Sequence, residues 1–445
     1  MNALGAAILL VLILVVSFSS PRGAVLGMLA GALFMTFEQV VNIAGFHLFA
    51  LRFLEIAGFI RIVRLKELYT IKLLSIDKTL ILLYLYATIV FLVRSKTDFA
   101  YTIGQMVDSL LCYFIFRALL TRLEDLQWLL KAFLVLLLPF VLLVATEMFT
   151  RNNPFEVIGG LHFVERGGRL RCMGTFRHPS LLGTLGASFL PLYIALVLNK
   201  NDIKSGFFGV VLCVAIILLA NSGGPLSAAA TGIVGWGLWL LREKMHWVRR
   251  GMVAFIILMA VVMKAPIWYL PAKVSAITGG DGWHRSYLMD VSFNNLDKWW
   301  LAGMPLIDTA DWFPYTVPAT GTADITNQFI AYGLQAGLLA TFIFIALLVA
   351  AFKAIGQVLS NIKEKAFSEW EVMAWGLGCT LAVHISTWLG ITYFDQTYLI
   401  WFMQLAAITS IKQVCDDKGI KSGIIRSDNK GSKKSYMTHR YRKNR

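Results

Sequence analysis

The chain has 445 residues, of which 57% are hydrophobic and only 15% are charged. Soluble domains carry about 25% charged residues, so this composition excludes a soluble enzyme, a disordered protein and a secreted disulfide-built domain. The formal net charge is +15, and in so apolar a chain a basic surplus indicates membrane topology before nucleic acid. We predict an all-α polytopic membrane protein, because apolar runs without strand-like alternation satisfy their backbone hydrogen bonds in lipid as helices.

Segments of about 20 mostly apolar residues are candidate membrane spans. They follow one another at 4–19, 24–43, 77–95, 99–119, 127–149, 180–199, 205–221, 225–241, 251–268, 327–352, 370–391 and 395–412. A shorter segment, 46–60, carries Arg52 and Glu55 and is either a short buried span or an interfacial helix. We expect about twelve transmembrane helices in total.

The distribution of Lys and Arg orients these spans. Residues 413–445 hold ten Lys and Arg and three Asp, a net charge of +7, which predicts a cytoplasmic C-terminus. Counting back places 150–179 and 269–325 outside. The expected organisation is N-terminal membrane helices (1–149), a core (150–352) with a large periplasmic loop (269–325), C-terminal membrane helices (353–412) and a basic cytoplasmic tail (413–445) near anionic lipid.

The five cysteines are scattered singly and no pair has metal-ligand spacing. We therefore expect neither a metal site nor a disulfide framework, and no sequence feature indicates a cofactor.

The exterior segment 150–179 is basic, against the usual orientation bias. Its centre runs from Arg169 and Arg171 through a glycine turn to Arg177 and His178, directly before an apolar helix that Pro179 suits as a first-turn residue. An anion there would meet a helix N-terminus and bidentate guanidiniums together. This pattern favours a phosphate or diphosphate site at the membrane surface; the alternative is contact with lipid headgroups.

The second exterior segment, 269–325, is acidic and rich in tryptophan. Loops of this length are usually functional or disordered, and its aromatic content argues against disorder. Arg285 beside Trp283, with Trp299 and Trp300 downstream, suits a phosphate next to a sugar ring, whose C–H face stacks on indole. The alternative is an interfacial aromatic belt.

A third polar group opens the late apolar helix at Asp324, Thr326 and Asn327. The group is either a helix cap with small-residue packing behind it, or it places Asp324 as a general base at the mouth of the bundle.

In this order, the three segments resemble the O-antigen ligase and Wzy-type polymerase superfamily of bacterial surface polysaccharide assembly. The similarity rests on the Arg-x-x-Gly-Thr-Phe-x-x-Pro-x-x-Leu-Gly element at 171–183, the loop arginine at Arg285 and the Asn-led helix at 326–337. Members commonly have Ser-Arg-Gly where this chain has Ser222-Gly223-Gly224, and His-Asn where it has Thr326-Asn327.

The resemblance implies a metal-independent, cofactor-free glycosyltransferase in the bacterial inner membrane that takes an undecaprenyl-diphosphate-linked glycan at the periplasmic face. It implies a catalytic group of Arg285, Asp324 as base and Asn327 as its orienter or a sugar contact. The diphosphate contacts it implies are Arg171, Arg177, Arg169 and His178, and the sugar contacts are Trp283, Trp299 and Trp300. It also allows for a chain-length regulator or an export complex as a protein partner beside membrane lipid.

The choice between polymerase and ligase stays open, with polymerisation or ligation to an acceptor other than lipid A core favoured, because the ligase-type histidine is absent. Two other classes remain. One is a secondary transporter or a flippase of lipid-linked sugars, which usually shows internal repeats and ionisable groups at the bilayer midplane. The other is a non-catalytic scaffold of an export complex.

Overall fold

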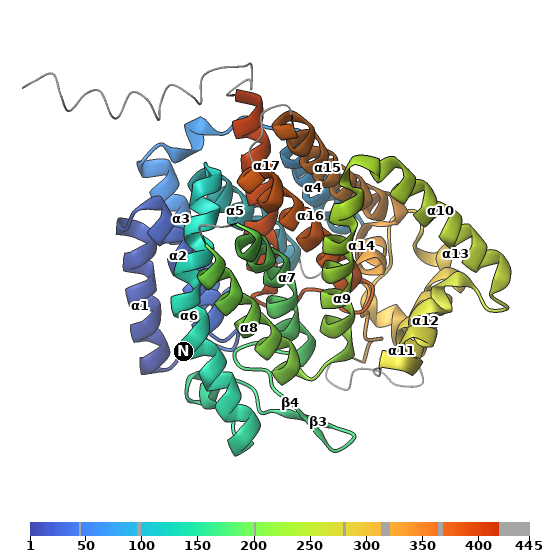
Figure 1. Ribbon diagram of the computed structural model, residues 1–445. Helices are drawn as coiled ribbons and strands as arrows, with labels where there is room; N and C mark the ends of the chain where they lie inside the picture. The colour runs from blue at the N-terminus through green and yellow to red at the C-terminus, as the bar shows by residue number, and fades with distance from the viewer. Residues whose placement is uncertain are drawn as a thin grey trace, which may run out of the picture.

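The computed structural model describes residues 1–43, 46–95, 99–199, 202–278, 282–312, 321–363 and 368–417. Within these ranges the chain forms a bundle of helices with two small hairpins at its edges (Figure 1). The predicted basic tail lies outside the described residues from 418 onward.

The first part of the chain supplies one side of the bundle. Its helices are α1 (Ala3–Phe18), α2 (Pro21–Phe34), α3 (Ala50–Arg64), α4 (Ser75–Arg94), α5 (Phe99–Leu119) and α6 (Leu123–Thr150), with the 3-10 helix η1 (Glu67–Thr70). A hairpin pairs β1 (Val40–Ile43) with β2 (Phe46–Phe49) in antiparallel register.

The middle of the chain begins with η2 (Pro154–Ile158) and a second antiparallel hairpin, β3 (Val164–Arg166) and β4 (Arg169–Arg171). Its helices are α7 (Pro179–Leu198), α8 (Ile203–Ala220), α9 (Gly223–Gly237), η3 (Leu238–Lys244), α10 (Met245–Val262), η4 (Ile267–Tyr269), α11 (Leu270–Thr278), α12 (Gly282–Asn294), α13 (Leu296–Trp299) and η5 (Leu306–Trp312). The last helices are α14 (Gln328–Ala336), α15 (Leu338–Lys363), α16 (Ser368–Trp388) and α17 (Thr397–Asp417).

Seven helical segments of the described chain are long and apolar enough to cross a membrane. They are Ser75–Arg94, Thr102–Leu119, Leu123–Thr150, Pro179–Leu198, Ile203–Ala220, Gly223–Val262 and Leu338–Ile362. The all-α, multi-span class predicted from composition is therefore confirmed. Seven is fewer than the predicted total of about twelve, and the larger number stays a prediction.

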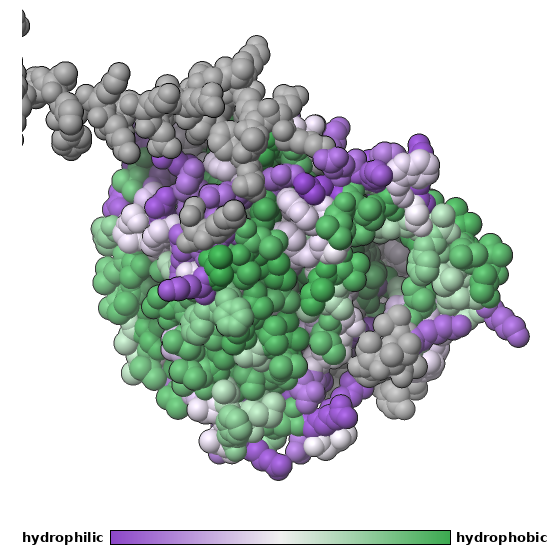
Figure 2. Space-filling view, viewed as in Figure 1, coloured by the Kyte–Doolittle hydropathy of each residue, from purple (hydrophilic) through white to green (hydrophobic). Residues whose placement is uncertain are grey.

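Polar and apolar residues are distributed over the surface as a membrane protein requires. Figure 2 shows a hydrophobic band over the body of the bundle, with hydrophilic residues gathered at its two ends. Apolar side chains that face a bilayer cost nothing to leave unburied, which explains why α10 has no buried residue although its sequence is almost wholly apolar.

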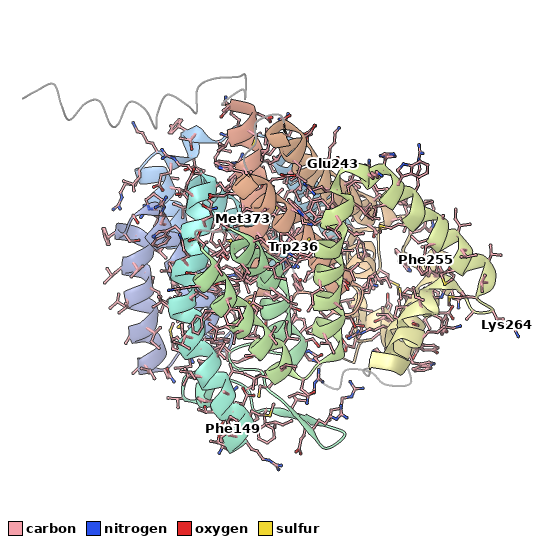
Figure 3. All side chains as sticks on the ribbon, viewed as in Figure 1. Phe149, Trp236, Glu243, Phe255, Lys264 and Met373 are labelled. Carbon is pink, nitrogen blue, oxygen red and sulfur yellow. The ribbon has the colours of Figure 1, made fainter. Side chains whose placement is uncertain are left out.

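The bundle has two opposite ends (Figure 1). The turn between α9 and α10 lies with the end of α17, and Glu243 marks that end; Phe149 marks the other, beside the hairpin β3–β4 (Figures 1 and 3). Lys72 also pairs with Asp417 at the first end. We call the two ends the tail end and the hairpin end.

One predicted span is wrong over half of its length. The apolar run 24–43 leaves helical geometry at Met35, which is extended, and its last four residues form β1. The cause is tertiary: the Thr36 hydroxyl and the Gln39 amide both donate to the Ile158 carbonyl oxygen, at 2.6 and 2.7 Å. A short apolar run fits a strand as well as a helix.

The predicted exterior loop 269–325 is not an open loop where it is described. It folds into α11, α12, α13 and η5 around its own small apolar core, in which Trp299 and Trp312 are buried. The late span 327–352 is also interrupted. Gly337 ends α14 with a φ of +83°, and a Cβ there would lie 2.4 Å from the Leu301 carbonyl oxygen.

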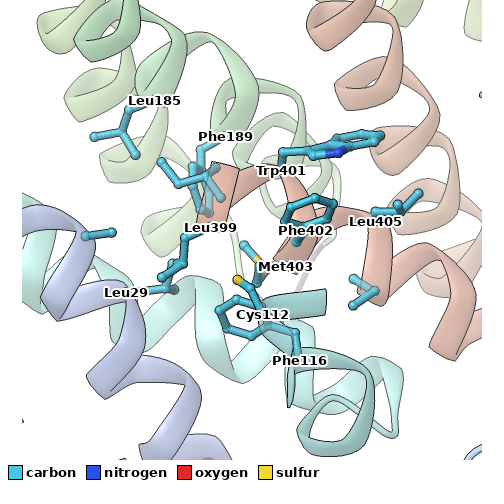
Figure 4. Close-up of a cluster of buried hydrophobic side chains, with 14 of the residues drawn as sticks. Leu29, Cys112, Phe116, Leu185, Phe189, Leu399, Trp401, Phe402, Met403 and Leu405 are labelled. Atoms are coloured by element: carbon cyan, nitrogen blue, oxygen red, sulfur yellow. The ribbon is translucent and has the colours of Figure 1, made fainter. Parts of the chain in front are cut away.

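Helices α7 and α17 run through the centre of the bundle. In the apolar window of α7, 83% of the residues are buried, whereas no other candidate span exceeds 50%. Figure 4 shows α7 side chains such as Leu185 and Phe189 packed with the α17 residues Leu399 and Met403. Both central helices begin at the hairpin end, so their N-terminal residues have rigid support where the polar segments meet.

Candidate functional site: a cationic cavity at the hairpin end

A cavity of about 740 Å³ lies where the three polar segments of the sequence meet. Its wall comes from the hairpin β3–β4, the start of α7, the turn from α8 into α9, the start of α12, residues 324–326 and residues 390–394. Its ionisable lining residues are Arg166, Arg169, Arg171, Arg285, Asp324, His178 and His284. With neutral histidines, four arginines face one carboxylate, so the cavity is built for an anion.

The turn that carries the first arginine group is held by a buried carboxylate. Glu147, in the last turn of α6, accepts hydrogen bonds from the backbone N–H groups of Met173 and Gly174, each at 2.8 Å. The Asn153 amide donates to the Gly174 carbonyl oxygen at 2.7 Å. Gly174 has a φ of +57°, the left-handed region that favours glycine. This turn therefore has one conformation, and it sets the path from β4 to α7.

We expect Glu147→Ala to weaken anion binding in the cavity, although Glu147 does not line it. The change leaves two buried N–H groups without an acceptor, and a hydrogen bond to a charged group contributes about 1.5–3 kcal/mol. Both the midpoint of thermal unfolding and the affinity for inorganic pyrophosphate should fall, with Glu147→Gln intermediate because its amide oxygen keeps one acceptor. Titration calorimetry and an unfolding scan on the purified protein measure both; an unchanged affinity in Glu147→Ala would show that the turn does not position the cavity.

Arg171 joins the hairpin to the start of α9. Its guanidinium donates to the Ser222 hydroxyl at 3.1 Å, and the Ser222 and Ser180 hydroxyls lie 2.9 Å apart. Arg171 is buried. Burial, and then the positive charges of Arg166 and Arg285, lowers the pKa of Arg171. An anion in the cavity would relieve this repulsion.

His178 is held as a neutral hydrogen-bond donor. It is the N-cap of α7, and its Nδ1 accepts from the Ser180 backbone N–H at 3.1 Å. Burial, followed by the charges of Arg171, Arg285 and Arg166, lowers the pKa of His178 to about 4. With Nδ1 engaged as an acceptor, the neutral ring carries its proton on Nε2. His178 can thus donate to an anion or a sugar oxygen, but it is unsuited to act as a base.

Arg285 lies between two glycines that are distant in sequence, Gly224 at the start of α9 and Gly390 in the turn after α16. A Cβ at Gly390 would come 2.7 Å from Arg285 Cζ, and a Cβ at Gly224 would come 3.1 Å from its Nη2. Glycine at both positions therefore leaves the space that the guanidinium occupies. The Ser222-Gly223-Gly224 stretch, where the chain departs from the Ser-Arg-Gly of the family it resembles, is therefore part of the site.

The third segment contributes one carboxylate and one buried hydroxyl. Asp324 lines the cavity, and burial raises its pKa, an effect that His284 partly opposes. The hydroxyl oxygen of Thr326 is buried and has no hydrogen-bond partner in the described part of the chain. Buried polar atoms normally have hydrogen-bond partners, so this hydroxyl is free to bond to a ligand in the cavity.

Two predicted site residues have other contacts. Arg177 lies 3.3 Å from Glu38, with its guanidinium over the ring of Phe37, and it does not line the cavity. Asn327 is buried and caps α14, because its side-chain oxygen accepts from the N–H groups of Phe329 and Ile330.

The predicted sugar-stacking tryptophans are not among the residues that line the cavity. Trp299 is buried, with its indole N–H donating to the Ser292 carbonyl oxygen at 2.9 Å. Trp283 is half exposed and stacks on Tyr287, with ring centroids 5.0 Å apart. Trp300 is likewise about half exposed.

Several polar lining residues were not assigned to this site from the sequence: Arg166, Ser180, Asn221, Ser222, His284 and Thr392. Only Arg166 carried a signal, as one more arginine in a basic exterior segment. Nothing in the local sequence distinguishes these serines and the threonine from other polar residues. They reach the cavity only because packing brings distant segments together.

No family model matches the chain, and no curated protein matches it either. Within the described residues, no group of three or more His, Cys, Asp or Glu side chains is arranged to hold a metal ion. Fold and hydropathy together define a helical multi-span membrane protein with a cationic cavity at one end.

Proposed function

We propose that this protein is a glycosyltransferase that transfers or polymerises an undecaprenyl-diphosphate-linked oligosaccharide at the periplasmic face of the bacterial inner membrane. The observation that carries the proposal is the cavity in which Arg166, Arg169, Arg171 and Arg285 converge on one end of a membrane bundle. Guanidiniums bind phosphate oxygens in bidentate geometry, and a diphosphate is a compact dianion that needs several of them.

The surroundings suit a substrate that is half lipid and half sugar. The volume of about 740 Å³ lies within the usual range of ligand pockets, roughly 300–1,000 Å³. Apolar Ile217, Leu218 and Leu226 share its wall with the charged groups. Figure 2 also shows the surface hollowed between the body of the bundle and the arm that α10 forms, where an isoprenoid tail can lie against apolar side chains.

The chemical step follows from these residues. An acceptor hydroxyl oxygen forms a bond to the anomeric carbon of the donor, while the bond from that carbon to the diphosphate breaks. The hydroxyl proton passes to the Asp324 carboxylate, and the bonding electrons leave with the diphosphate. Arg171 and Arg285 stabilise the charge that develops on this leaving group, which is where fixed positive groups accelerate such a reaction.

Asp324→Asn is expected to lower turnover about 100-fold, the lower range for loss of a general base. In the wild type, turnover should fall as pH decreases through the pKa of Asp324, because only the carboxylate accepts a proton. That pKa is raised from 3.8, so the fall begins at a higher pH than for an ordinary aspartate. Asp311→Asn, an exposed acid that does not line the cavity, is the matched control. Equal turnover in wild type and Asp324→Asn would remove the base from the mechanism.

A cellular experiment separates this function from transport. Arg171→Ala and Arg285→Ala should each abolish high-molecular-weight polysaccharide on gels while the protein stays in the membrane. Lipid-linked single units should then collect on the periplasmic side. Units trapped on the cytoplasmic side would indicate a flippase instead, and normal polymer in both variants would contradict a glycosyltransferase.

A further inference from the structure

A second, smaller pocket lies beside the cationic cavity and shares Phe394 with it. Its volume is about 150 Å³. An apolar cavity of about that size holds a benzene molecule, so the space fits one six-membered ring. Nothing in the mechanism above uses this pocket.

Aromatic side chains make up most of its wall: eleven of its sixteen lining residues are Phe, Tyr or Trp. They come from the segment before β1, from β2, α4, α14, α15, the end of α16 and α17, and from the segment between α16 and α17. Trp388, Trp401 and Tyr393 lie against one another, with ring centroids 4.7 to 5.5 Å apart between Trp388 and its two neighbours. Aromatic faces at right angles to one another offer stacking surfaces from more than one direction.

The remaining five lining residues are polar: Arg52, Gln105, Asp108, Ser109 and Gln328. Arg52 and Asp108 form a bidentate ion pair, with their closest atoms 2.8 Å apart. The Gln328 side-chain oxygen accepts from the Tyr393 backbone N–H at 3.0 Å. A wall that combines ring faces with amides and charged groups suits a ligand with both C–H faces and hydroxyls.

Trp388 has a donor without an acceptor. The residue is 1% exposed, and its indole Nε1 has no hydrogen-bond partner in the described part of the chain. Buried tryptophan N–H groups usually have a partner. Trp375, on the same helix, shows the ordinary case: its Nε1 donates to the Gly235 carbonyl oxygen at 3.0 Å.

We propose that this pocket binds one sugar ring of the glycan, with the Trp388 N–H donating to a sugar oxygen and the aromatic faces stacking on the ring. The proposal rests on the function proposed above. The shared Phe394 places the sugar pocket next to the diphosphate cavity, as a ring close to the reacting bond requires. An isoprenoid tail fits less well, because it would leave the buried Trp388 N–H without an acceptor.

The probe for the test is the oligosaccharide released by mild acid from the producing cell's own surface polysaccharide, titrated into the full-length protein in lipid nanodiscs. Trp388→Phe keeps a six-membered aromatic face and removes the N–H donor together with the five-membered ring, a loss of volume that Trp375→Phe shares. It should weaken oligosaccharide binding about fivefold to tenfold. Gln105→Ala, at an exposed position of the wall, should weaken it severalfold without disturbing the core. Trp375→Phe is the matched control and should leave the affinity unchanged.

Affinity for inorganic pyrophosphate should stay at the wild-type value in all three variants, which separates this pocket from the cationic cavity. A raised KM for the lipid-linked donor alone would assign the ring to the donor, and a raised KM for the acceptor alone would assign it to the acceptor. Unchanged oligosaccharide affinity in both Trp388→Phe and Gln105→Ala, or displacement of the probe by farnesol, would overturn the sugar pocket while leaving the glycosyltransferase intact. If the wild-type protein bound neither pyrophosphate nor the lipid-linked donor, that result would instead refute the glycosyltransferase function on which the sugar pocket rests.

Discussion

Replacing Arg285 with alanine is expected to lower the affinity for undecaprenyl diphosphate by about 100-fold or more. A bidentate guanidinium makes two charge-assisted hydrogen bonds, each contributing about 1.5–3 kcal/mol. Gly224 and Gly390 leave the space that this side chain occupies. Titration of the lipid into purified variants measures the loss.

Two comparisons separate geometry from charge. Arg285→Lys keeps the positive charge but loses the planar fork, so it should recover only part of the affinity. Arg151→Ala removes an arginine at the same end of the molecule that is 72% exposed and does not line the cavity. Its binding should match the wild type. Comparable losses in Arg285→Ala and Arg151→Ala would mean that the anion responds to general surface charge, not to this cavity.

The second large effect concerns stability at the tail end. Asp77→Ala is expected to destabilise the protein by about 3–5 kcal/mol, since it leaves a buried arginine without its partner. Asp77 is fully buried and lies 3.4 Å from Arg117, which is 3% exposed. The carboxylate also accepts from the Tyr113 hydroxyl at 2.7 Å and caps the start of α4 through the Leu74 N–H. Its loss therefore breaks several contacts that hold the start of α4 against α5.

The matched control for Asp77 is an exposed pair at the same end. Lys72, 69% exposed and just before α4, pairs with Asp417 at the end of α17. Exposed pairs contribute little in water, so Lys72→Ala should leave the unfolding midpoint close to the wild type. A scan of both purified variants compares them directly. If Asp77→Ala unfolds at the same temperature as Lys72→Ala, the buried pair does not hold the bundle together.

The arginines of the cavity could be predicted as site residues, because a charged residue in so apolar a chain usually serves either membrane topology or a binding site. Arg169 and Arg171 both line the cavity because they are two residues apart in β4, and alternate residues of a strand share a face. Arg177 follows in an irregular turn where no such period applies. Its direction is set by Glu38, far away in sequence, and no local pattern could have shown that.

Aromatic residues misled the sequence reasoning for a similar reason. The tryptophans of 283–300 were expected to stack on sugar, yet Trp299 is a core residue of the small cluster beneath α12. The pocket that combines many rings draws them from eight parts of the chain. Composition cannot distinguish a tryptophan that fills a core from one that faces a ligand, because both are apolar and both are large.

The most direct measurement uses the purified protein in lipid nanodiscs with undecaprenyl-diphosphate-linked oligosaccharide and an oligosaccharide acceptor. We predict a longer glycan together with an equal amount of released undecaprenyl diphosphate, and neither product from Arg285→Ala. No transfer by the wild type, together with movement of the intact lipid-linked donor across the bilayer in proteoliposomes, would contradict the proposed function and identify a transporter.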